Sequence, residues 1–215
     1  MIVSIIIPTK NEPLINEFIE EVHRVLKNFK HEIIVVDKSN VTPCVKGAKL
    51  IIQKTDGLGK AIIEGLKHAS GELIVTVDGD FSHDPKHIPE LIEKTNGYDI
   101  VIASRFVCGG STQDKTHRVL ISKFFRSLAS FVLKLNIKDP LSGYSVIKRS
   151  VYDKLKLNPI GYKINMEILY KGKKFGFKSI EVPIVFHKRR AGKSKARIKE
   201  GLKTLIFIFK LKFGL

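Results

Sequence analysis

The sequence predicts an α/β fold in which a mostly parallel sheet is covered by helices on both faces. In the first half of the chain, short runs rich in Ile and Val alternate with amphipathic segments of helical period. These runs are continuously apolar, which is typical of strands buried on both faces of a parallel sheet. The chain has 215 residues, 43% of them hydrophobic. One domain with a substantial core and a short appendage is the simplest organisation.

The first half supplies the predicted sheet and its first helices. The strands are Ile2–Ile7, Glu32–Asp37, Leu50–Gln53, Leu73–Asp78 and Asp99–Ala103. The helices that lie between several of them are Ile15–Leu26, Gly59–His68 and Pro85–Lys94. Ligands of such sheets bind at the carboxyl ends of the strands, and polar clusters follow Ile7, Val36 and Val77. We therefore expect the functional site at that edge.

The second half is less regular and ends in a basic helix. In chain order we expect a helix at Thr116–Leu135, a turn-rich segment at Asp139–Tyr144, a helix near Lys163–Tyr170, a strand at Ser179–Phe186, a basic loop at His187–Arg197 and a helix at Ile198–Phe213. This divides the chain into an α/β domain over residues 1–197 and an appended helix over residues 198–215.

Composition narrows the classes of partner. The formal net charge is +17, from 38 basic and 21 acidic residues, which favours nucleotide phosphates, lipid head groups or nucleic acid. Only Cys44 and Cys108 occur, outside any CxxC pair, so we expect neither a disulfide framework nor a zinc ribbon, and a reducing cytosolic compartment fits. Met1–Lys10 reads as a buried strand and not as a signal peptide. No apolar window is long enough to span a bilayer.

Two carboxylates follow the fourth predicted strand. In Asp78-Gly79-Asp80 the glycine lets the backbone turn sharply, so the two side chains can converge beyond the strand end. Oxygen ligands without nearby cysteine suit Mg²⁺ or Mn²⁺, and such a cation stabilises a departing diphosphate. The alternative is an ordinary strand-end turn, in which Asp and Gly are common. Asp84, which precedes Pro85, is expected to cap the next helix.

Three further polar clusters are candidates for nucleotide binding. They are Pro8–Glu12, Asp37–Ser39 and Gly57–Lys60. Strand-end acidic residues often accept hydrogen bonds from a ribose, and free amides at a helix start, such as that of Gly59, favour anions. The glycine pattern is neither GxGxxG nor a Walker loop, which disfavours dehydrogenases and ATPases. Turn and capping roles explain each cluster about as well.

Taken in order, the motifs resemble a known family. The series PTKNE, VVDKS, GLGKA, VDGDFSHDP, ASRF, DPLSGY and EVPIVFHKRRAGKSK resembles the inverting glycosyltransferases of the GT-A fold, which is Rossmann-like. More narrowly, it resembles the dolichyl-phosphate mannose synthases, over residues 2 to about 197. The resemblance implies transfer of mannose from GDP-mannose to dolichyl or another polyprenyl phosphate with inversion. The product would be a lipid-linked sugar donor for protein glycosylation.

The resemblance also implies roles for individual residues. Those that would surround the nucleoside are Pro8, Glu12 and Asp37. Those that would bind Mg²⁺ or Mn²⁺ and the diphosphate are Asp78 and Asp80. Arg105 and Arg118 would contact phosphates of the donor or acceptor. Arg189 and Lys195 would close over the diphosphate and the acceptor phosphate. Some relatives carry Gln two positions after the second Asp, where this chain has Ser82.

The implied acceptor needs no general base. A phosphate monoester has a second pKa of about 6 and is largely dianionic at neutral pH. The enzyme must instead bring this anion beside an anionic donor, which a metal ion with several Arg and Lys residues achieves. Without the metal motif, the basic loop would read as a solvated charge run. The roles of two further acidic residues stay open. Asp139 is a candidate for orienting a turn, and Glu167 is a candidate partner of a basic group.

The terminal helix is the expected membrane contact. Its apolar stripe is Ile198, Leu202, Leu205, Ile206, Phe209 and Phe213, flanked by Lys199, Lys203, Lys210 and Lys212. A basic amphipathic helix of this kind lies in the bilayer interface. We expect peripheral attachment at the cytoplasmic face of the membrane, or a membrane-anchoring partner subunit. The helix 116–135 faces either the membrane or the core.

Two other functions are compatible with parts of the sequence. The nearer one is a UDP-glucose-dependent polyprenyl-phosphate glucosyltransferase, or a transferase that acts on another sugar acceptor. The chain has no tryptophan and no QxxRW-like element, which disfavours processive polysaccharide synthases. The more distant one is a basic nucleic-acid-binding protein. It is supported by charge alone, because no helix-turn-helix, zinc or RNP-type signature occurs, and we expect no nucleic-acid partner.

Overall fold

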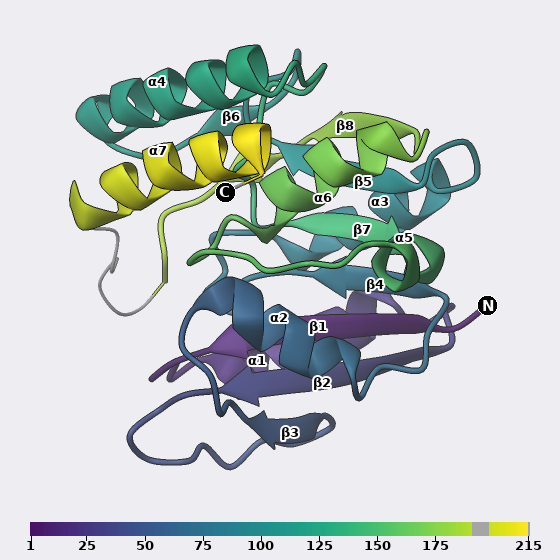
Figure 1. Ribbon diagram of the computed structural model, residues 1–215. Coiled ribbons are helices and arrows are strands. Elements are labelled where there is room, and N and C mark those ends of the chain that lie inside the picture. The colour runs from purple at the N-terminus through teal and green to yellow at the C-terminus, as the bar shows by residue number, and fades with distance from the viewer. Residues whose placement is uncertain (191–197, 215) are drawn as a thin grey trace.

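The computed structural model describes residues 1–190 and 198–214, and helices pack on both faces of its central sheet (Figure 1). The strands of this sheet, in spatial order, are β3 (Lys49–Ile52), β2 (His31–Asp37), β1 (Val3–Thr9), β4 (Leu73–Thr76), β7 (Ser145–Lys148), β5 (Ile100–Ser104) and β8 (Ser179–Pro183). Neighbours pair in parallel, except that β7 is antiparallel to β4 and β5. The prediction of a mostly parallel α/β sheet is confirmed.

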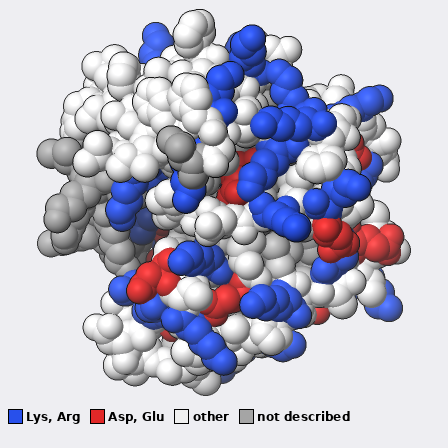
Figure 2. Space-filling view, viewed as in Figure 1, with Lys and Arg blue, Asp and Glu red and all other residues white. Residues whose placement is uncertain are grey.

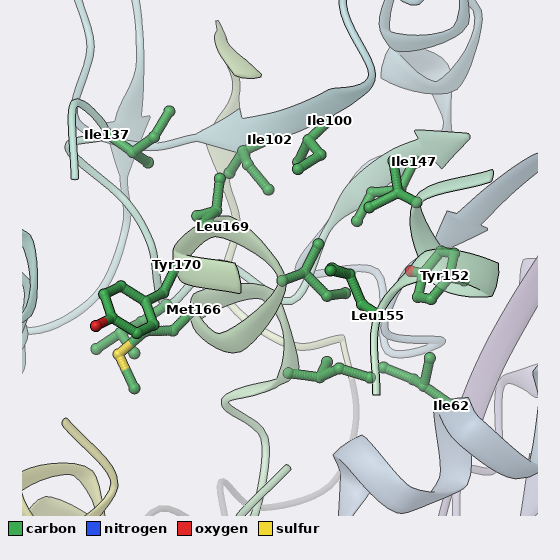
Figure 3. Packing of buried hydrophobic residues seen from close by; sticks show 14 of the residues in the cluster. Ile62, Ile100, Ile102, Ile137, Ile147, Tyr152, Leu155, Met166, Leu169 and Tyr170 are labelled. Atoms are coloured by element: carbon green, nitrogen blue, oxygen red, sulfur yellow. The ribbon is translucent and has the colours of Figure 1, made fainter. Parts of the chain in front are cut away.

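Alternate residues of each strand feed two hydrophobic cores on opposite faces of the sheet. In β1, Ile5 and Ile7 belong to one core and Ile6 to the other. The first core is covered by α1 (Ile15–Val25) and α3 (Ile88–Lys94). The second is covered by α2 (Leu58–Leu66), α5 (Arg149–Lys154), α6 (Ile164–Lys174), α4 (Thr116–Val132) and α7 (Ile198–Phe213). Figure 3 shows the second core, where side chains of α2, α5 and α6 lie against Ile100, Ile102 and Ile147.

Several elements differ from the sequence prediction. Strand β7 and helix α5 were not expected, because four and six residues are too few to show a clear period. The predicted strand Ser179–Phe186 is two strands, since Pro183 ends β8 and β9 (Val185–Phe186) instead pairs with β6 (Ser111–Thr112). The helix predicted from Pro85 begins as a 3₁₀ turn.

The expected cap of that turn is confirmed. The carboxylate of Asp84 accepts a hydrogen bond from the amide of Lys86 at 3.0 Å, with Pro85 at the first position. Asp84 is therefore committed to local structure, at a turn that directly precedes α3 in the chain.

Helices α4 and α7 lie side by side and each has an inner and an outer face (Figure 1). In α7, the inner side chains Phe207, Ile208 and Leu211 join the second core. The outer apolar side chains of both helices are exposed: Leu120, Ile121, Phe124 and Phe131 on α4, and Leu202, Ile206, Phe209 and Phe213 on α7. The segment 116–135 thus faces the core on one side only, and its helix ends at Val132. The predicted boundary at 197/198 adjoins residues outside the described ranges.

The carboxyl ends of β1, β2, β4 and β5 meet at one edge of the sheet. The antiparallel β7 brings a further segment there, because the hydroxyl of Thr76 donates to the carbonyl of Gly143 at 3.1 Å. Strands β2 and β3 extend from one side of β1, and β4 follows on the other. The reversal creates a topological switch point, which is where α/β sheets bind ligands.

A substitution at Gly71 tests the close packing of the opposite edge. A methyl group there would lie 2.7 Å from the amide nitrogen of Ser4 and 2.8 Å from the carbonyl oxygen of Ile2. We expect Gly71→Ala to lower the free energy of unfolding by about 1–3 kcal/mol in urea denaturation. Gly97→Ala, with nothing within 4 Å of the added carbon, is the control and should change it by less than about 0.5 kcal/mol. Equal losses in both variants would contradict this packing.

Candidate functional site

A cleft of about 550 Å³ opens at the carboxyl edge of the sheet. Its walls come from the segments that follow β1 to β5, from the turn 141–143, from Gly161 and Tyr162, and from Lys203 of α7. Of the residues predicted for the site, those that line this cleft are Pro8, Glu12, Asp78, Asp80, Arg105 and Arg189. Predicted residues as far apart in the chain as Pro8 and Arg189 therefore share one cavity.

Asp78 lies where β4 opens into the cleft. Its side chain is 28% exposed, and one carboxylate oxygen lies 3.6 Å from Nδ1 of His83. Burial of the group and the neighbouring Asp80 carboxylate raise the pKa of Asp78 to about 7. His83 itself is buried between the rings of Tyr144 and Phe186. Burial lowers the pKa of His83 to about 4, so this ring is neutral at pH 7.

Asp80 is held by bonds to both carboxylate oxygens. Oδ1 accepts hydrogen bonds from the amide of Ser82 at 2.9 Å and from the Ser82 hydroxyl. Oδ2 forms an ion pair with Nε of Arg189 at 2.8 Å. Ser82 therefore orients Asp80.

The two carboxylates fit a hard divalent cation by their chemistry. They supply oxygen donors at the open end of a strand, beside a turn without cysteine, which suits Mg²⁺ or Mn²⁺. Within residues 1–190 and 198–214, no group of three or more His, Cys, Asp or Glu side chains is arranged to hold a metal ion. Diphosphate oxygens and water would have to complete the coordination of a cation bound at Asp78 and Asp80.

Arg105 is fixed by the buried carboxylate of Asp139. Its Nε and one terminal nitrogen donate to the two Asp139 oxygens at 2.8 and 2.9 Å, and its amide donates at 3.2 Å. The guanidinium also lies over Phe106 and Phe186. Burial disfavours the charged guanidinium and so lowers its pKa, but the hydrogen bonds and charge of Asp139 have the larger, opposite effect. The pKa of Arg105 is therefore raised. Arg105 thus offers the cleft a rigid donor whose charge is already balanced, and Asp139 does more than orient the turn.

Two predicted nucleotide residues have other roles in the structure. Asp37 is buried and accepts from the hydroxyl of Thr9 and from the amide and hydroxyl of Ser39, which braces the ends of β1 and β2. The amide of Gly59 donates to the carbonyl of Gly161 at 2.6 Å. The amide that was expected to be free for an anion is therefore occupied. Neither Asp37 nor Gly59 is among the described residues that line the cleft.

Two predicted phosphate contacts stay untested. Lys195 lies outside the described residues. Arg118 belongs to the first turn of α4, and its side chain is outside the described part of the chain. Both remain predictions.

Several cleft residues were missed by sequence reasoning. Lys38 and Asp56 form an ion pair of 2.6 Å at the rim, and Tyr162 and Lys203 reach the cleft from the second half of the chain. The signal for Lys38 was the strand-end cluster that contains it. No local pattern marks Tyr162, because only the tertiary fold places its neighbour Gly161 opposite Gly57.

Glu167 pairs with a basic group, which was one of the open alternatives. Its Oε1 accepts from Lys171 Nζ at 2.6 Å and from the amide of Asn158 at 2.9 Å. These contacts fix Asn158 in the segment before α6, and Glu167 is not among the described residues that line the cleft.

Comparison with known proteins gives a family match and several similar proteins. Residues 4–156 match the family described as glycosyl transferase family 2. The chain is 39% identical over 226 aligned residues to the dolichol-phosphate mannosyltransferase of Pyrococcus furiosus, covering 98% of this chain and 64% of that protein. It is 31% identical to the polyprenol monophosphomannose synthase of Mycolicibacterium smegmatis, covering 65% of this chain and 56% of that protein. The chain thus spans less than two thirds of the length of either relative.

A solved structure resembles the whole chain. The glucosyl-3-phosphoglycerate synthase from Mycobacterium tuberculosis, in complex with Mn²⁺, UDP and glucosyl-3-phosphoglycerate, superposes with a TM-score of 0.74. The match covers 99% of this chain and 80% of that one at 20% identity. At 20% identity, this similarity supports a shared fold and not a shared function.

The ion pair between Arg105 and Asp139 gives a first prediction for the site. Asp139→Asn leaves a buried guanidinium without its counter-charge, so we expect a loss of about 3 kcal/mol in the free energy of unfolding. Asp56→Asn is the matched control, because its pair with Lys38 is solvent-exposed and should contribute nothing measurable. Denaturant melts of both variants provide the comparison. A stable Asp139→Asn protein would show that Arg105 does not depend on this carboxylate.

Proposed function

The chain belongs to glycosyl transferase family 2, and from this premise we propose that it transfers mannose from GDP-mannose to dolichyl or another polyprenyl phosphate with inversion. It is a glycosyltransferase with an α/β fold of the GT-A type. The observation that carries the proposal is the cleft in which Asp78 and Asp80 face Arg105 and Arg189. The two relatives, a dolichol-phosphate mannosyltransferase and a polyprenol monophosphomannose synthase, support mannose as the transferred sugar and a polyprenyl phosphate as the acceptor.

The cleft suits an anionic donor that leaves as a nucleoside diphosphate. A divalent cation at Asp78 and Asp80 would supply positive charge to the leaving diphosphate. The protein adds Lys10, Lys38 and Arg189, which line the same cleft. Each phosphate charge neutralised at close range in a partly dry site is worth several kcal/mol. Pro8 and Glu12, at the end of β1, would contact the nucleoside.

The acceptor phosphate is already a nucleophile. It is largely dianionic at neutral pH, so the residues of the cleft need only hold it in line with the sugar carbon and screen its charge from the donor. Arg105, locked by Asp139, would position a phosphate oxygen by hydrogen bonds. We assign Arg118 and Lys195 to phosphate contacts on the resemblance alone.

A lipid acceptor fits the relation between α7 and the cleft. Lys203 lines the cleft, while its neighbours Leu202 and Ile206 belong to the exposed apolar face of α7. One helix thus connects the phosphate-binding region to an apolar surface. A polyprenyl chain lying along that surface would place its phosphate at the mouth of the cleft.

The outer faces of α4 and α7 are proposed to lie on the membrane. In Figure 2 the surface over these two helices is largely uncharged, with Lys and Arg side chains near its rim. Lys123, Lys210 and Lys212 are exposed on the same helices, and each would contribute about 1 kcal/mol near an anionic leaflet. Within the described residues, no helix has the length and apolar character to cross a bilayer. We propose peripheral attachment at the cytoplasmic face, or attachment through a membrane-anchored partner subunit.

A second candidate function uses another donor. The solved structure with a similar fold is a complex with UDP and Mn²⁺, so the fold is compatible with a UDP-glucose-dependent polyprenyl-phosphate glucosyltransferase as well. Parallel assays with radiolabelled GDP-mannose and UDP-glucose on the same polyprenyl phosphate separate the two.

The activity itself is tested by product analysis. Purified protein is incubated with Mn²⁺, a mixture of nucleotide sugars and polyprenyl phosphates, and lipid products are identified by mass spectrometry. We expect a mannosyl phospholipid that is absent with Asp80→Ala, because that variant loses a cation ligand. Asp84→Ala, which removes only a cap, should retain the product. A lipid product that persists in Asp80→Ala would overturn the assigned site.

Membrane attachment is tested by vesicle sedimentation. Leu202→Ser with Phe209→Ser removes two exposed side chains from the outer face of α7. Each apolar side chain withdrawn from water contributes about 1.5–3 kcal/mol, so we expect binding to anionic vesicles to weaken at least about tenfold. Phe175→Ser, exposed at the end of α6, is the control. Unchanged binding of the double variant would contradict the assigned face.

A further inference from the structure

The basic segment after β9 is paired along the loop that carries Asp80. The amide of His187 donates to the carbonyl of Ser82 at 2.9 Å, and that of Arg190 donates to the carbonyl of Asp80 at 3.4 Å. Phe186 and His83 form an antiparallel bridge just before these contacts. The segment is therefore attached to the loop by its backbone, whatever its side chains bind.

The two arginines of this segment have different environments. The guanidinium of Arg190 lies 4.0 Å from the ring centre of Phe81 and is outside the cleft lining. The Arg189 side chain lines the cleft, is 38% exposed and pairs with the 4% exposed side chain of Asp80. Arg190 thus anchors the segment, and Arg189 can turn within the cleft without disturbing the core.

Asp80 has no uncommitted oxygen in this arrangement. Ser82 occupies Oδ1 through its amide and hydroxyl, and Arg189 occupies Oδ2. The Ser82 contacts are local to the loop itself and do not depend on the Arg189 side chain. A cation that approaches from the cleft therefore meets Asp80 at the oxygen that Arg189 holds.

We propose that Arg189 is the counter-ion of Asp80 until a divalent cation displaces it, and that the displaced guanidinium then binds the diphosphate of the donor. The inference rests on the proposed function, because it takes a nucleoside diphosphate as the ligand of the released arginine. Oδ2 of Asp80 exchanges one cation for another, and no covalent bond changes. The exchange couples the two events, since Arg189 becomes available to phosphate only when the cation has replaced it.

The exchange has an electrostatic reason. Asp78 and Asp80 bring two acidic groups together at the end of β4, and Arg189 balances part of that charge while no cation is bound. A cation of charge +2 interacts more strongly with both carboxylates than one guanidinium does. The arginine then faces the anionic diphosphate, which it can bind through two nitrogens.

The test measures Mn²⁺ binding in the absence of nucleotide. Free Mn²⁺ is followed by electron paramagnetic resonance during titration of the full chain and of Arg189→Gln. We expect Arg189→Gln to bind Mn²⁺ about fivefold more tightly, the upper range for loss of a competing, partly exposed ion pair. The same variant should bind GDP or UDP more weakly at saturating Mn²⁺, because the released arginine is missing.

Arg190→Gln is the matched control. It removes the same charge from the neighbouring position, so any general electrostatic effect on Mn²⁺ binding appears in both variants. Arg189→Lys keeps a competing charge without the planar guanidinium, and its Mn²⁺ affinity should fall between those of wild type and Arg189→Gln. Opposite changes in metal and nucleotide affinity, confined to position 189, support the exchange.

Other results overturn the exchange or the function separately. If Arg189→Gln binds Mn²⁺ no more tightly than Arg190→Gln, Arg189 does not compete with the metal and the exchange is wrong, whatever nucleotide the protein binds. If Arg189→Gln gains Mn²⁺ affinity but the wild-type chain binds neither GDP nor UDP with Mn²⁺, the metal competition stands. In that case the proposed binding of the diphosphate by Arg189 and the proposed function are both wrong.

Discussion

The gathering of negative charge at the end of β4 is the constraint on which the site depends. Asp78 and Asp80 lie two residues apart at a strand terminus, and partial burial makes their shared charge costly. Ser82 and Arg189 bind Asp80, and Lys10 and Lys38 add positive charge. A divalent cation and an anionic donor would together balance the charge that remains in the cleft.

The parallel sheet explains how residues distant in the sequence meet at this charge. Continuous apolar runs predicted β1, β2, β4 and β5, and the carboxyl ends of parallel strands share one edge. The polar residues that follow those strands could therefore be assigned to one site from their positions in the sequence. Pro8, Glu12, Asp78 and Asp80 are in the cleft for this reason. Arg105 and Arg189 were assigned to the site from the order of the motifs. The positions of the strand ends alone would not have identified them.

What the sequence could not provide depends on contacts between distant segments. Gly59 opens a helix, as expected, but its amide is taken by Gly161, which lies far along the chain. Asp139 reads as a turn residue, yet its carboxylate holds Arg105. Strand β7 is too short to show a period and becomes a strand only between β4 and β5. In each case the partner that decides the role lies elsewhere in the chain.

The most direct measurement is the position of manganese in crystals grown with Mn²⁺ and a nucleoside diphosphate, located by anomalous diffraction. We expect one peak at about 2 Å from oxygens of both Asp78 and Asp80, in contact with the diphosphate and with Arg189 moved off Asp80. A nucleotide bound in the cleft with no manganese at either carboxylate would contradict it.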